Sequence, residues 1–120
     1  MTLFQRLGGA AAVDAAVDIF YQRILADPLL AGFFSGVDMD KQIKKQKAFL
    51  TVAFGGAPRY DGRGLRSAHA ASVERGLSDV HFDAVAGHLR ATLQQLGAAE
   101  SDIEEVMAIT ESVRAEVLNR

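Results

Sequence analysis

The feature that most constrains this chain is a glycine-rich loop followed by a helix that carries one histidine. Residues 49–69 read Phe-Leu-Thr-Val-Ala-Phe-Gly-Gly-Ala-Pro-Arg-Tyr-Asp-Gly-Arg-Gly-Leu-Arg-Ser-Ala-His. Apolar and small residues surround His69 at helical spacing, which places the imidazole on the buried face: Leu65, Ala68, Ser72 and Val73. An unpaired buried polar group costs about 1–3 kcal/mol, so this imidazole needs a partner. A metal ion is one such partner.

Length and composition indicate a single globular domain over residues 1–120. Hydrophobic residues make up 49% of the chain and charged residues 23%, as in ordinary globular proteins. The net charge of −2 argues against nucleic acid as a partner. The chain has no cysteine, which excludes disulfides and thiolate ligation. We see no signal peptide and no segment able to span a membrane, so we expect a cytoplasmic protein.

Apolar periodicity predicts helices throughout, and no stretch shows sustained β alternation. We expect an all-α fold with four long helices and two short ones. Three caps are predicted: Asp38 before a helix from Met39 to about Phe54, Ser78 before the next, and a capping box at Ser101–Glu104 before the last. Asp27-Pro28 ends one helix and opens a short one, since proline is tolerated at the first helical position.

The helix from Met39 places two glutamines inside its apolar stripe. Gln42 and Gln46 lie one turn apart on the buried face, although each amide requires several hydrogen bonds. Lys45 lies at the margin of this stripe. The other lysines of the helix lie away from it: Lys41, Lys44 and Lys47.

Four side chains point toward one interior space: His69, Tyr21, Gln42 and Gln46. Each has a plain structural alternative. The histidine could be bonded to a backbone carbonyl, the tyrosine could be a core aromatic with its hydroxyl in water, and the helix phase of the glutamines could be misjudged. Together they describe one imidazole facing neutral donors, which suits a haem iron with a small ligand opposite. Six phenylalanines could supply flat apolar walls for the porphyrin: Phe20, Phe33, Phe34, Phe49, Phe54 and Phe82.

These residues resemble the first group of the truncated haemoglobins. The similarity extends over most of the chain and implies a truncated globin domain, a two-over-two helical sandwich around a haem. The matching elements are Leu7-Gly8-Gly9, Phe20-Tyr21-Gln-Arg23, Asp27-Pro28, Phe33-Phe34, Val37-Asp38-Met39, Lys41-Gln42, Gln46-Lys47-Ala-Phe49-Leu50, Gly55-Gly56, Tyr60-Asp-Gly62-Arg63, Ala68-His69 and His81-Phe82-Asp-Ala-Val85.

The resemblance implies a role for each site residue. His69 would be the proximal iron ligand of a haem b (iron protoporphyrin IX) bound non-covalently, and the last helix has no histidine that could attach to a vinyl group. The distal donors would be Tyr21, Gln42 and Gln46. Phe34 would pack on the haem face. The further pocket candidates are Phe49, Phe54 and Leu65, and the candidates for pairing with a propionate are Arg66 and Lys45.

Lys45 departs from the family pattern, because several relatives carry at this position a histidine that can bind iron. A lysine amine can be a sixth ligand only after it loses a proton, and an ordinary lysine has a pKa near ~10.4. The alternative is that the charged amine pairs with a propionate. Both roles stay open.

The resemblance implies reversible binding of O2, and also of NO or CO. Strong distal donors favour chemistry on bound O2 over oxygen transport, so nitric oxide dioxygenation to nitrate is a possible enzymatic activity. The chain has no flavin or nicotinamide motif, and a separate reductase would be needed. The lysines from Lys41 to Lys47 could dock this reductase or simply be a solvated face. The rival hypothesis is a small helical interaction module without a cofactor.

Overall fold

The computed structural model describes residues 2–55 and 62–120, except for the side chains of residues 62–66 and 68. The described residues form eight α-helices and one 3₁₀-helix and no strand, which confirms the all-α prediction. In chain order the elements are α1 (Leu3–Leu7), α2 (Gly9–Leu25), α3 (Pro28–Ala31), η1 (Gly32–Phe34), α4 (Met39–Ala53), α5 (Gly62–Glu74), α6 (Asp79–Gln95), α7 (Glu100–Ser112) and α8 (Arg114–Val117).

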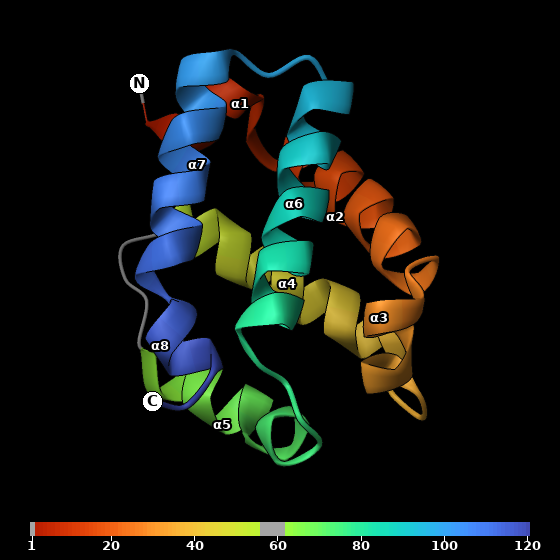
Figure 1. Ribbon diagram of the computed structural model, residues 1–120. Coiled ribbons are helices and arrows are strands. Elements are labelled where there is room, and N and C mark those ends of the chain that lie inside the picture. Colours follow the sequence, from red (N-terminus) through yellow and green to blue (C-terminus); the bar gives the residue numbers. More distant parts are fainter. Residues whose placement is uncertain (1, 56–61) are drawn as a thin grey trace.

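Four of the long helices are stacked in two pairs, α2 with α4 and α6 with α7. Helix α2 packs against α4 and also against α6, and α6 packs against α7. Figure 1 shows α6 and α7 standing side by side, with α4 crossing behind them and α5 below. Helix α8 packs on α5, so the last turn of the chain supports the helix that carries His69. This is the two-over-two arrangement that the sequence resemblance implied.

The core is built mainly from one face of α2, which lies between α4 and α6. Val17 and Ile24 are almost completely buried there, and Ile103 and Val106 of α7 are buried equally well. Burying one such side chain fully stabilises the fold by about 1.5–3 kcal/mol. Because Tyr21 follows Phe20 on the same face, the core also positions the hydroxyl of Tyr21.

The helix ends follow the local sequence signals. The carboxylate of Asp27 accepts a hydrogen bond from the Leu29 N–H at 2.9 Å and caps α3, which begins at Pro28 as predicted. Asp38 caps α4 by accepting from the Asp40 N–H at 3.1 Å. Gly8 has φ of +115° between α1 and α2, a left-handed conformation that disfavours any residue with a Cβ.

Two details of the prediction are wrong. The described residues contain five helices of at least 13 residues, rather than four long ones. The predicted capping box at Ser101–Glu104 does not open the last helix, which begins at Glu100 after Ala99 without a side-chain cap. The backbone N–H groups of Asp102 and Ile103 already donate to the Ala99 carbonyl, so the helix starts earlier than the side-chain pattern indicated.

The single helix predicted at the end of the chain is divided into two, α7 and α8. Its α-helical backbone is interrupted at Val113, where ψ is close to zero, and α8 follows at Arg114. Among the helices that the structure describes, none is both long enough and apolar enough to cross a membrane.

Candidate functional site

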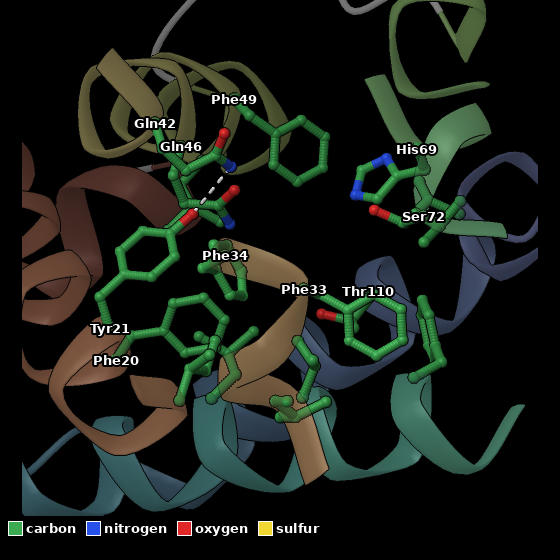
Figure 2. Close-up of a pocket in the computed structure, with 18 of the residues that line it drawn as sticks. Phe20, Tyr21, Phe33, Phe34, Gln42, Gln46, Phe49, His69, Ser72 and Thr110 are labelled. Atoms are coloured by element: carbon green, nitrogen blue, oxygen red, sulfur yellow. Dashed lines mark hydrogen bonds between the residues drawn. The ribbon is translucent and has the colours of Figure 1, made fainter. Parts of the chain in front are cut away.

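A cavity of about 240 Å³ lies between the two helix pairs. Helix α5 lines it on one side, and α2, η1 and α4 line it on the other. Its walls are mainly aromatic and aliphatic, and Figure 2 shows the rings converging on one space. The lining includes all six phenylalanines that the sequence singled out: Phe20, Phe33, Phe34, Phe49, Phe54 and Phe82.

His69 reaches this cavity from α5. It is half-buried, and Figure 2 shows its ring pointing inward, opposite Phe49 and the two glutamines of α4. Helical spacing from Gly62 brings His69 and Ser72, three residues apart, to the same face. The cavity therefore has an imidazole nitrogen on one wall and amide groups on the opposite wall.

Tyr21 and Gln42 form the polar part of the opposite wall. The Gln42 Nε2 group donates to the Tyr21 Oη at 3.1 Å, although the two residues belong to different helices. The Tyr21 ring is only 4% exposed and is held by edge-on contact with Phe34, with ring centroids 5.7 Å apart. Since Tyr21 Oη already accepts this bond, its own proton can be donated toward the cavity.

Burial keeps that proton in place. Loss of solvation raises the pKa of Tyr21 above its usual value, and the hydrogen bond from Gln42 opposes this rise without cancelling it. Tyr21 is therefore a neutral hydroxyl donor at physiological pH. Gln46 lies one turn after Gln42 on the same wall, and its amide has no hydrogen-bond partner among the described residues.

These residues fit a haem. A porphyrin needs flat apolar walls, one axial nitrogen and a space opposite that nitrogen, and the aromatic lining, His69 and the Tyr21–Gln42 pair provide all three. Across the described residues, no group of three or more histidine, aspartate or glutamate side chains is close enough to hold a metal ion. Among the described lining residues, His69 is the single imidazole.

The remaining predicted site residues differ in where they lie. Lys45 is exposed and does not line the cavity, although it follows Gln42 by one turn. The side chains of Leu65 and Arg66 lie outside the described residues. The sequence placed Ser72 on the buried face beside His69 but did not assign it, or Thr110, to the site, and both line the cavity. Helical periodicity predicts which face of a helix is buried, but it does not indicate that the buried face with Thr110 meets this cavity.

A two-over-two helical sandwich enclosing an aromatic cavity with one inward imidazole defines a haem protein of the globin class. The chain belongs to the bacterial-like globin family, whose model matches residues 2–119. Its relatives confirm the resemblance to the first group of truncated haemoglobins, because those it matches over most of its length are named as members of that group.

Individual relatives agree with this assignment. The chain is 55% identical over 109 residues to the group 1 truncated hemoglobin of Synechocystis sp., covering 90% of this chain and 88% of that protein. It is 39% identical over 119 residues to the group 1 truncated hemoglobin of Tetrahymena pyriformis, covering 99% and 96%. The crystal structure of the 2/2 hemoglobin of Synechococcus sp. in the cyanomet state, with covalently attached heme, superimposes with a TM-score of 0.95 at 50% identity and covers 100% of both chains. These relatives confirm haem as the cofactor.

Proposed function

We propose that this protein holds haem b non-covalently through His69 and reversibly binds O2, and also NO or CO, on the side that faces Tyr21. One observation supports this most directly. A half-buried imidazole and a Tyr21–Gln42 donor pair face each other across an apolar cavity. The haem would supply an iron at which a diatomic ligand binds.

The distal residues would determine how long a polar ligand stays. The Tyr21 hydroxyl and the Gln46 amide can each donate to a ligand that carries partial negative charge, and Gln42 orients Tyr21. Each hydrogen bond contributes about 1 kcal/mol or more, so two or three together slow release by roughly a hundredfold. The phenylalanine walls exclude water, which would compete for the same donors.

Non-covalent binding is supported by the absence of a histidine after His88 in the sequence. Neither α7 nor α8 can therefore offer an imidazole to a vinyl group. In this respect the chain would differ from the Synechococcus protein, whose haem is covalently attached.

We include nitric oxide dioxygenation in the proposal, in which NO and O2 are converted to nitrate. Slow O2 release favours such chemistry over oxygen transport, because the ligand stays long enough to meet NO. A separate reductase must then return one electron to the iron in each cycle. We also propose that the protein is cytoplasmic, where it would meet such a reductase.

Optical spectra of the ferric, ferrous and CO-bound protein test the proposal. The wild type should show a Soret band, His69→Ala should lose stable haem binding, and His88→Ala, which changes a histidine outside the cavity lining, should retain it. Normal haem retention with an unchanged ferrous spectrum in the His69 variant would overturn the proposal. A colourless wild type that takes up no added haemin would favour the cofactor-free interaction module.

A further inference from the structure

All the lysines of this chain lie in one helix. Lys41, Lys44, Lys45 and Lys47 all belong to α4. The first three are exposed and share one face, because they are spaced by three and four residues. We call these three residues the lysine face. Lys47 points elsewhere and lies 3.5 Å from the Asp14 carboxylate.

Within the part of the chain that the structure describes, the lysine face has no partner, unlike the arginines of the other helix pair. No ion pair or hydrogen bond of these three ammonium groups occurs within the described residues. The arginines on the opposite helix pair are neutralised by carboxylates. Arg90 contacts Glu100 and Glu104, and Arg114 contacts Asp79 and Asp83.

The lysine face is therefore a small positive patch on an otherwise acidic molecule. The net charge of the whole chain is −2, although four lysines are concentrated in α4. The segment that forms α7 and α8 has one basic residue, Arg114, and the acidic residues Glu100, Asp102, Glu104, Glu105, Glu111 and Glu116. An approaching acidic protein is thus attracted to α4 and repelled from α7.

The patch also adjoins the cavity. The neighbouring face of α4 carries Gln42, Gln46 and Phe49, which line the cavity wall. A helix with its side chains is about 10–12 Å across, so a protein docked on the lysine face would lie within roughly one helix diameter of the bound cofactor. Figure 2 shows both glutamines and Phe49 projecting inward from this helix.

We infer that the lysine face docks a small acidic one-electron carrier protein, which re-reduces the haem iron. This inference rests on the proposed function. Electron-transfer encounters are transient and use small interfaces, which Lys41 and Lys44 can provide even when a haem propionate pairs with Lys45. Nucleic acid and anionic membranes fit less well, because an extended polyanion would also meet the acidic remainder of the surface.

The redox step involves one electron and no atom transfer. An iron–sulfur or flavin centre in the carrier loses one electron, and the ferric iron gains it and becomes ferrous. The lysines take no part in the bond changes. They orient the carrier and raise the rate of encounter, so their effect must weaken as salt screens the charges.

Stopped-flow reduction of the ferric holoprotein by a reduced plant-type [2Fe–2S] ferredoxin, a small acidic carrier, tests the inference. The second-order rate constant of the wild type should fall steeply with ionic strength. The double variant Lys41→Gln, Lys44→Gln should react about tenfold more slowly at low salt, with a flatter salt dependence. Lys45 is left unchanged because it has a proposed role at the haem.

A matched control separates local docking from net charge. Gln94→Glu with Ser101→Asp also changes the charge by two units, at exposed positions on the end of α6 and the start of α7, far from the start of α4 in Figure 1. This variant should keep the wild-type rate to within about twofold. Equal slowing in both double variants, or no slowing in the lysine variant, would overturn the inference.

A binding measurement is independent of turnover. When oxidised ferredoxin is titrated into the CO-bound ferrous protein, amide chemical shifts should change along α4, and the changes should disappear in the lysine variant. Shifts confined to another surface, or lysine-dependent binding to anionic vesicles or duplex DNA but not to ferredoxin, would overturn the inference. The lysine variant should keep the Soret and CO-bound spectra of the wild type. A failure of haem binding would therefore be seen in these spectra and could be told apart from a failure of docking.

Discussion

Tyr21 shows how one side chain is prepared for its role by three neighbours. Gln42 donates to its oxygen, Phe20 and Phe34 hold its ring, and burial raises its pKa, so that it remains protonated. The hydroxyl is thus a neutral donor with one proton to offer the cavity.

Tyr21→Phe should remove about 1–2 kcal/mol of stabilisation from a bound polar ligand. We therefore expect O2 to dissociate about tenfold faster, with CO affected much less because bound CO is less polar. Stopped-flow and flash-photolysis rates for the two ligands measure the effect. Equal changes for O2 and CO would indicate a steric role for the ring.

Lys45 can be tested through the pH response of the ferrous protein. Iron ligation needs a neutral amine and strengthens as pH rises, whereas a propionate pair needs the charged amine. Because Lys45 is exposed and off the cavity wall, we expect the propionate pair and no low-spin six-coordinate ferrous spectrum at alkaline pH. A low-spin spectrum in the wild type that disappears in Lys45→Ala would instead establish ligation.

At the scale of elements, the short helix α3 and η1 depend on Asp27. Its carboxylate caps α3 through the Leu29 N–H and contacts His88 Nε2 on α6 at 2.8 Å. These elements carry Leu30, Phe33 and Phe34 into the cavity wall. The hydrogen bond from His88, and then that from Leu29, lower the pKa of Asp27 below its usual value.

A lowered pKa makes the contribution of Asp27 to stability pH-dependent. The stabilisation is fully present above the unfolded-state pKa of about 3.9 and is lost as pH falls through the lower folded-state value. Urea unfolding should therefore show that wild type exceeds Asp27→Asn in stability by a constant amount at neutral pH and by less below about pH 4. Asp18→Asn, which replaces an exposed carboxylate on α2, is the matched control for the loss of one negative charge. A pH-independent gap for Asp27→Asn would contradict this assignment.

At the scale of the whole molecule, Arg114 joins the end of the chain to the start of α6. Its guanidinium contacts Asp79 at 3.1 Å and Asp83 at 2.6 Å, and lies over the Phe82 ring at 4.4 Å. The next residues form α8, which packs on α5. This chain of contacts links α6 to the helix that presents His69.

Arg114→Ala should weaken both the fold and the hold on haem. Loss of the cation–ring contact alone removes about 0.5–2 kcal/mol, and the carboxylates of Asp79 and Asp83 lose a shared partner. Thermal unfolding should shift down by several degrees, and haem transfer to excess apomyoglobin should speed up several-fold. Arg90→Ala breaks a similar carboxylate contact between α6 and the start of α7, the end of α7 that lies away from α5 in Figure 1, and should lower Tm slightly with no change in haem transfer.

The sequence by itself determined the helices and the faces they bury. Helical periodicity is a local property, so it placed His69, Tyr21, Gln42 and Gln46 on inward faces and selected the phenylalanines of the wall. Local caps at Asp27 and Asp38 fixed where two helices start, because the capping bonds span only a few residues.

Only the tertiary structure decided which of these faces meet. The Tyr21–Gln42 bond joins residues 21 positions apart, and its existence depends on how α2 and α4 cross. The packing of the helices also brings Thr110 to the cavity and leaves Lys45 outside its lining. Helix crossings arise from the fit of many side chains at once, so no local pattern could specify them.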